Sequence, residues 1–267
     1  MAMGGLGALN QINRTNSAVN SSIRKIATGS QRPSASYGAS SYAIAARMSS
    51  NVGTAAQSQR NAQNANAMLN VAAGGVSSTV DALTNIKSQI LQAANGTNKD
   101  SDVATIRDSI QQSVSTINDN ANVEYNGMKL LDGSRSITVA GDTGYKTVNL
   151  GNLSSEGLGL TDEKGKLKID LSSSQGIESA LETVDNALNS ALDLSTDIGA
   201  VQQGLSFSEA NYTTMSESLT ESLSTEDDTD IAAEVTKLRS AETQNQLALH
   251  AQKMFMHNSA QVLSLLP

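Results

Sequence analysis

Apolar residues recur in alternating steps of three and four along three long stretches of the chain, the spacing that places them on one face of an α-helix. The first stretch covers about residues 9–26, and Gly29 follows it as a helix-stopping residue. The second runs from about residue 42 to 94 without a change of phase, but its middle is rich in Ala. The third covers about residues 177–223 in a coiled-coil pattern. Its predicted inward positions include Val184, Leu188, Ala191, Ser195 and Ile198.

The same spacing predicts two further helices. One covers about residues 103–117, with Asp100 or Ser101 as its N-cap. The other begins after the acidic run 226–230 and carries apolar residues on two stripes, so we expect it to need two packing partners. The apolar residues predicted to pack the first and last helices are Leu9, Ile12, Val19, Ile23, Ile26, Ile231, Val235, Leu238, Leu249, Phe255, Met256, Val262, Leu263 and Leu266.

Residues 122–176 lack this spacing and contain turn signals, among them Asn126-Gly127 and residues 141–144. Residues 137–139 and 167–171 alternate apolar and polar side chains, so we predict strands there and a small region of β-hairpins. Because helices precede and follow this region, the chain is expected to fold back and bring its two ends together. The predicted fold is mainly α, a long coiled-coil-like helical rod with a small β-hairpin subdomain and paired N- and C-terminal helices.

The composition agrees with long helices in contact along their length. Aromatic residues make up 3% of the chain, with two Phe and no Trp, so burial depends on many small side chains. The absence of Cys excludes disulfides and thiolate metal sites. The formal net charge of -8 argues against binding to nucleic acid phosphates. The sequence has no apolar run of about 18 residues that would predict a membrane helix.

Few residues suggest chemistry. His250 and His257 are seven positions apart on the last predicted helix, which is not the i, i+4 spacing of a chelating pair. The acidic run 226–230 offers oxygen ligands but lacks the Gly and distal Glu of a calcium loop, so a cap for the last helix is the favoured interpretation. We expect no catalytic residue, no metal and no cofactor.

Short motifs in both halves of the chain resemble those of bacterial flagellins, roughly over residues 5–135 and 177–266. Residues 94–98 read A-N-G-T-N, residues 125–131 read Y-N-G-M-K-L-L and residues 261–266 read Q-V-L-S-L-L, each similar to a family motif. Where the family usually has K-D-D, this chain has Ser36-Tyr37-Gly38. Single positions that match family motifs are Arg32, Arg47, Arg60, Asn61, Asn95, Gly96, Asn126, Gly127 and Asp230.

The resemblance implies a secreted, non-enzymatic subunit of the extracellular bacterial flagellar filament, which polymerises for motility as an open helical homo-oligomer. It also implies type III export through the flagellar apparatus, an export chaperone and a filament cap as partners, with no nucleic acid and no membrane insertion. The expected segments are a filament-core helix and break at 1–40, an outer helical shell at 41–176 with its β region at about 122–176, a returning shell helix at 177–225 and a C-terminal core helix at 226–267.

One segment departs from the family in a way that matters for recognition by a host. In flagellins detected by the vertebrate flagellin-sensing Toll-like receptor, the sensed helix reads about Q-R-V-R-E-L-A-V-Q-S-A-N-G-T-N. Here residues 84–92 read T-N-I-K-S-Q-I-L-Q, so both Arg residues are missing. We expect this chain to be a poor ligand for that receptor, because of the changes at Asn85, Lys87, Ser88 and Gln89.

Other functions remain open on the sequence alone. A hook–filament junction protein would share the terminal helices, although the internal motif at residues 94–98 favours a filament subunit. A flagellin-like surface adhesin would need a binding region in its middle, and the middle of this chain is short. An enzyme is the weakest alternative, because no catalytic constellation is present.

Overall fold

The computed structural model describes residues 2–134, 136–141, 144–162 and 164–264. The side chains of residues 2–5, 140, 141, 145, 146, 148 and 262–264 are outside this description. The chain divides into two compact units, which we call the terminal unit (residues 1–53 and 216–267) and the central unit (residues 54–215). Two long helices, α2 (Ala39–Ala93) and α4 (Ser174–Asp227), contribute residues to both units.

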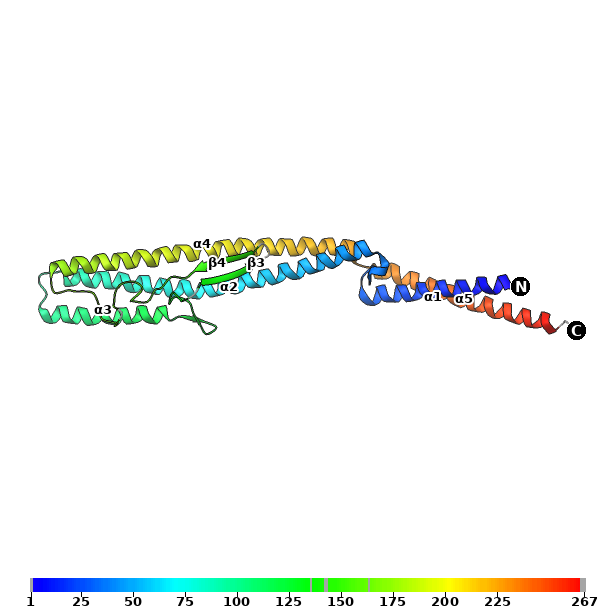
Figure 1. Cartoon of the computed structure of the whole chain (residues 1–267), viewed down its shortest axis with the longest axis horizontal. Helices are drawn as coiled ribbons and strands as arrows, with labels where there is room; N and C mark the ends of the chain where they lie inside the picture. Colours follow the sequence, from blue (N-terminus) through cyan, green and yellow to red (C-terminus); the bar gives the residue numbers. More distant parts are fainter. Residues whose placement is uncertain (1, 135, 142–143, 163, 265–267) are drawn as a thin grey trace. The chain divides into compact units, whose positions relative to one another are not determined.

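In the terminal unit, α1 (Ala2–Thr28) and α5 (Ile231–Ser264) lie side by side and antiparallel (Figure 1). The predicted pairing of the N- and C-terminal helices is therefore confirmed. Gly29 ends α1 with a φ of +70°, a left-handed conformation that favours glycine. A short 3₁₀ helix (Ala35–Tyr37) occupies the break before α2.

The two connections of the terminal unit are hydrogen-bonded to each other. Ser30 and Asp228 form an antiparallel β-bridge, the Gln31 N–H donates to the Asp227 carbonyl at 2.6 Å, and the Thr229 N–H donates to the Gly29 carbonyl at 2.9 Å. These bonds satisfy backbone groups that helix ends leave unpaired. The α1–α2 connection is thereby fixed against the α4–α5 connection.

In the central unit, α2 and α4 pack together with α3 (Asp100–Ala121) around an apolar core. The spacing predicted for residues 42–94 is confirmed from Ala55 to Ile90, over ten successive steps of three and four, whereas Ile44 near its start is exposed. Its buried residues are Ala55, Ser58, Ala62, Ala65, Leu69, Ala72, Val76, Thr79, Leu83, Ile86 and Ile90.

The predicted inward face of α4 is only half right. Val184, Ala191 and Ile198 are buried as expected, but Leu188 is half-buried and Ser195 is exposed. Ala187 and Leu194 are buried in their place. The buried face therefore shares Val184, Ala191 and Ile198 with the prediction and extends to the preceding neighbour of each of the other two positions, while Leu188 packs at the edge of the core.

Four polar pairs hold α2 and α4 of the central unit in one register. The two residue numbers of each pair have the same sum, so the antiparallel alignment does not slip between the first pair and the last. The pairs are Gln59 with Thr213 (3.1 Å), Gln63 with Glu209 (2.7 Å), Asn70 with Gln202 (2.8 Å) and Lys87 with Asp185 (2.5 Å).

Two antiparallel hairpins lie in the predicted β region. Strands β1 (Glu124–Tyr125) and β2 (Met128–Lys129) are joined by Asn126-Gly127, whose φ angles of 51° and 73° suit a type I′ turn. Strand β3 (Ser136–Gly141) includes the predicted residues 137–139, and it pairs with β4 (Gly144–Asn149), which was not predicted. Residues 142 and 143 of the predicted turn lie outside the described residues.

The strand predicted at 167–171 is wrong. Leu167, Ile169 and Leu171 are buried at alternate positions, but the segment contains only an isolated bridge between Leu167 and Thr161. Its apolar side chains pack in the core among α2, α3 and α4 without a hydrogen-bonded neighbour strand. The alternation therefore reflected burial on one side, which an extended segment meets without joining a sheet.

The helix caps also differ from expectation at one point. Lys99, rather than Asp100 or Ser101, is the N-cap of α3, and the Asp102 Oδ2 accepts a hydrogen bond from the Lys99 N–H at 3.1 Å. Asp230 does cap α5, because its Oδ1 accepts from the Ala233 N–H at 3.0 Å. The acidic run is split, since Asp227 is the last residue of α4.

Candidate subunit interface

The contact between α1 and α5 consists mainly of small and polar side chains. On α5 the buried residues recur every seven positions, and on α1 they follow the spacing of one helix face. They are Glu234, Ala241 and Ala248 on α5 and Ile12, Thr15 and Ser22 on α1. These residues bury little apolar area, and the larger Val19, Ile26, Leu238 and Phe255 on the same faces are only half-buried, so the hydrophobic stabilisation between α1 and α5 is modest.

Polar bonds occupy the same contact. The Ser22 hydroxyl donates to the Glu234 Oε1 at 2.8 Å, and the ammonium groups of Lys25 and Lys237 lie 3.9 Å and 3.1 Å from the Glu234 carboxylate. The hydrogen bond from Ser22, followed by the two Lys, holds the pKa of the Glu234 carboxyl below its ordinary value against the opposing effect of desolvation.

Large apolar residues lie on the outside of this helix pair. Leu9 and Ile23 on α1 are 46% and 47% exposed, and Leu249 and Met256 on α5 are 43% and 64% exposed. Ile23, Leu249 and Met256 each follow directly after a residue of the α1–α5 contact face. Because α1 and α5 are antiparallel, a residue that directly follows a contact residue lies on the same side of the helix pair whichever helix it belongs to. We call Leu9, Ile23, Leu249 and Met256 the first row.

A second set of exposed apolar residues lies elsewhere on α5. Leu247 and Met254 are 64% and 59% exposed and are seven residues apart. They directly precede Ala248 and Phe255 of the contact face, so they lie on the other side of the helix pair from the first row. Met254 also lines an open groove with His250, Lys253, His257 and Asn258. We call Leu247 and Met254 the second row. Unpartnered apolar rows of this kind mark surfaces that another molecule covers.

The residues predicted to pack the terminal helices are thus divided. Ile12 is buried, and Val19, Ile26, Val235, Leu238 and Phe255 are half-buried. Leu9, Ile23, Ile231, Leu249 and Met256 are exposed. Val262, Leu263 and Leu266 lie outside the described side chains. The sequence analysis predicted no role for Glu234 and Ser22. It also did not single out Leu247 and Met254, whose seven-residue spacing was the available signal.

The charge of α1 and α5 differs from that of the rest of the chain. Together these helices contain six Lys or Arg and two Asp or Glu, whereas the whole chain has a net charge of -8. Glu242 is exposed and follows directly after the contact residue Ala241, so it lies on the side of the first row. Lys253 lies beside the second row. The two rows therefore have side chains of opposite charge next to them.

Several family-like positions hold local structure. The Arg32 guanidinium donates to the Glu226 carbonyl and pairs with the Glu226 carboxylate at 3.4 Å, which ties the α1–α2 connection to the end of α4. Arg60 donates to the Gln57 side chain at 3.0 Å, and Arg47 is exposed on α2. Asn95 and Gly96 lie in the turn between α2 and α3, and Asn61 lines a groove beside β3.

The segment that corresponds to the sensed helix lies on α2 in the central unit. Asn85 and Ser88 are exposed. Lys87 forms the ion pair with Asp185, and the Gln89 amide donates to Asn85 Oδ1 at 3.1 Å and to Ser109 Oγ at 2.8 Å. Three of the four altered side chains, Asn85, Lys87 and Gln89, are therefore engaged within the unit itself, and the first two also lack the fork of an arginine.

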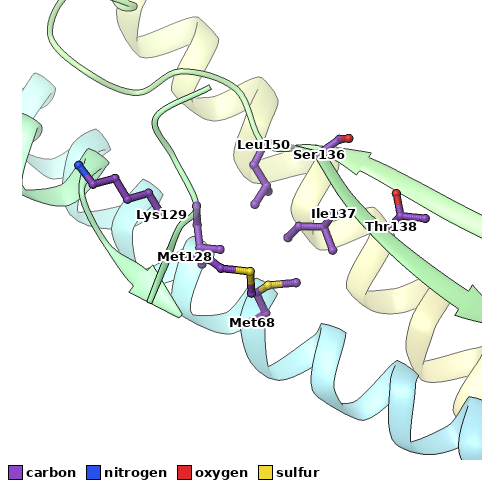
Figure 2. Close-up of a pocket in the computed structure, with 8 residues that line it drawn as sticks. Met68, Met128, Lys129, Ser136, Ile137, Thr138 and Leu150 are labelled. Carbon is purple, nitrogen blue, oxygen red and sulfur yellow. The ribbon is translucent and has the colours of Figure 1, made fainter. Parts of the chain in front are cut away.

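An apolar groove in the central unit lies beneath β3 (Figure 2). Met68 of α2 and Met128 of β2 point toward one another there, with Ile137 and Leu150 beside them. Lys129 is the charged residue that lines it. In the described part of the chain, no three His, Cys, Asp or Glu side chains are placed to hold a metal ion. Nor is any helix of the described residues long and apolar enough to cross a membrane.

Comparison with known proteins identifies the family. The bacterial flagellin N-terminal helical region matches residues 3–136, and the bacterial flagellin C-terminal helical region matches residues 181–266. The chain is 34% identical to a flagellin of Escherichia coli O127:H6 over 155 residues, 57% of this chain, and 32% identical to the phase 1 flagellin of Salmonella naestved over the same length. These alignments cover 28% and 31% of the two relatives.

Solved structures with the same fold come from the flagellum as well. A putative flagellar hook-associated protein from Vibrio parahaemolyticus has a TM-score of 0.61 at 16% identity, over 71% of this chain and 99% of that one. A Bacillus cereus flagellin has a TM-score of 0.50 at 22% identity, over 57% of this chain and 88% of that one. The two helical regions of the family together match more than half of this chain. The chain therefore belongs to the bacterial flagellins, a family of structural proteins and not of enzymes.

Proposed function

We propose that this chain is the structural subunit of an extracellular flagellar filament and that it polymerises through the first and second rows of its terminal unit. The observation that supports this most strongly is the arrangement of α1 and α5. The residues fully buried in their mutual contact are mostly small or polar and the larger ones are half-buried there, while six large apolar residues are exposed on two sides. A subunit of this kind gains most of its burial only when neighbours cover both rows.

The positions of the rows favour an open assembly. If the first row of one subunit contacted the same row of another, the pair would close as a dimer with two-fold symmetry. We infer instead that the first row of one subunit packs on the second row of the next, because Glu242 beside the first row is opposite in charge to Lys253 beside the second. A head-to-tail contact of this kind leaves one free row at each end and therefore continues as a filament.

Further roles follow from the resemblance and belong to the same proposal. The core helices would comprise about residues 1–40 and 226–267, with residues 41–225 as the surrounding shell. Partners during export and growth would be the flagellar export apparatus, a chaperone and the filament cap. A hook–filament junction protein is the second candidate, favoured by the fold shared with the Vibrio hook-associated protein. The match of both flagellin regions favours the filament subunit over it.

Electron microscopy of purified protein provides the test. The protein is concentrated, seeded with sheared fragments and imaged, and the concentration left unpolymerised is measured after centrifugation. Long filaments above a critical concentration are expected. A junction protein would instead yield short or closed assemblies that do not lengthen with added subunits, and a protein that stays monomeric at every concentration would contradict the proposal.

A further inference from the structure

Two methionines on the exposed rows suggest chemistry beyond assembly itself, in an inference that rests on the proposed function. Met256 belongs to the first row and Met254 to the second, and they are 64% and 59% exposed. The other methionines with described side chains are half-buried, namely Met48, Met68, Met128 and Met215. Met254 and Met256 are therefore the described thioethers most accessible to a dissolved reagent in the free subunit.

We propose that Met254 and Met256 form a peroxide-sensitive modification site that decides whether a free subunit can enter the filament. The thioether sulfur attacks one oxygen of hydrogen peroxide and forms a sulfur–oxygen bond, while the oxygen–oxygen bond breaks. The second oxygen keeps its own proton, takes the proton of the transferred oxygen and leaves as water. Sulfur is oxidised by two electrons to the sulfoxide, and the peroxide is reduced by the same two electrons.

Oxidation to the sulfoxide makes the two rows more polar, which weakens their contact with neighbouring subunits. A flexible apolar side chain becomes a polar one with a strong hydrogen-bond acceptor, which is costly to bury unless a donor meets it. On the first row, the nearest α5 member to Met256 is Leu249, seven residues before it, whose side chain has no hydrogen-bond donor. Because Met254 and Met256 lie on different sides of α5, oxidation of both impairs the contacts with two different neighbours.

Assembly also protects the site. Once neighbouring subunits cover the two rows, peroxide reaches the sulfurs slowly, so free subunits are modified and filament subunits are spared. The half-buried Met68 and Met128 serve as internal references, since they line a groove of the central unit (Figure 2) and belong to neither row. A sulfoxide reductase would return a modified subunit to the assembling pool.

The test uses the full chain, hydrogen peroxide and a matched variant. Wild type and the double variant Met254→Leu/Met256→Leu, which keeps apolar side chains of similar volume, are treated with peroxide as monomers and as filaments. Sulfoxide at each Met is measured by mass spectrometry, and the critical concentration for polymerisation is measured by sedimentation. Oxidised wild-type monomer is expected to need at least about a tenfold higher concentration, a change of about 1.4 kcal/mol. The critical concentration of the double variant, whatever its untreated value, is expected to be the same before and after peroxide treatment.

Two results would overturn the inference. One is a wild-type subunit that carries sulfoxide at Met254 and Met256 and still polymerises at the unmodified critical concentration. The other is a double variant that loses polymerisation on peroxide treatment as wild type does, which would assign the effect to other residues. Failure of untreated wild type to polymerise is a separate result, and it would overturn the proposed function as well.

Discussion

Replacement of Glu234 by Gln tests the polar contact between α1 and α5. The Glu234 side chain is 6% exposed, accepts a hydrogen bond from Ser22 and lies near two Lys side chains. Gln keeps the shape and one acceptor oxygen but removes the charge. Hydrogen bonds to charged groups contribute about 1.5–3 kcal/mol and neutral ones about 1 kcal/mol. Because Gln keeps an acceptor oxygen for the Ser22 hydroxyl, the loss is the difference between the charged and the neutral hydrogen bond, and we expect about 1 kcal/mol.

The same carboxylate makes the contact dependent on pH. The Ser22 hydrogen bond, more than the nearby Lys, keeps the pKa of Glu234 in the folded chain below its unfolded value of about 4.3. A depressed folded pKa means that the stabilisation is fully present above the unfolded pKa and is lost as the pH falls through the folded pKa. We expect acid below about pH 4 to weaken the α1–α5 contact in wild type, and the Gln variant to lack this dependence.

Native-state hydrogen exchange on dilute monomer measures both effects. Amides of α1 and α5 in the Glu234→Gln variant are expected to exchange several times faster than in wild type near neutral pH, since 1.4 kcal/mol corresponds to tenfold. Amides of the central unit should be unchanged. Glu242→Gln is the matched control, because Glu242 is exposed on the same helix and its change should stay within about 0.5 kcal/mol. Equal exchange in both variants would refute the role assigned to Glu234.

Three further predictions concern other parts of the chain. In the sedimentation assay, Leu249→Asp should raise the critical concentration at least about a hundredfold. The substitution removes roughly 1 kcal/mol of apolar burial and places a carboxylate in the subunit contact. Leu249→Met is the control and should polymerise as wild type does. Gly74→Ala should stabilise the central unit against urea unfolding by up to about 1 kcal/mol, because a Cβ at this position meets no atom within 4 Å. Gly75→Ala should not stabilise it, because its Cβ would lie 2.7 Å from the Cδ1 of the buried Leu131. In a Toll-like receptor reporter assay, depolymerised wild type should be far less potent than a standard stimulatory flagellin, and wild-type potency equal to that standard would contradict the expectation. The variant expected to gain potency carries Asn85→Arg, Lys87→Arg, Ser88→Glu and Gln89→Leu.

The amino-acid sequence was sufficient for the helices and their arrangement. The heptad spacing on α2 predicted its buried face from Ala55 to Ile90, because a long helix repeats the same contact and a change of phase would expose the whole face. The Asn126-Gly127 turn was equally readable, since both residues adopt positive φ angles that few other residue pairs tolerate. The sequence was sufficient to predict the conformation wherever interactions between residues close together in the chain determine it.

Only the tertiary structure decided which neighbour each face meets. Residues 167–171 alternate like a strand, yet no strand lies beside them, and β4 forms because β3 is there to pair with it. On α1 and α5 the sequence marked the apolar stripes, but the structure assigned the mutual contact to Glu234, Ser22 and small side chains and left Leu249 and Met254 outside. The periodicity of apolar residues predicts that a side chain will be buried against another surface. It carries no information about whether its own chain or another copy does the covering, because both remove the same apolar surface from water.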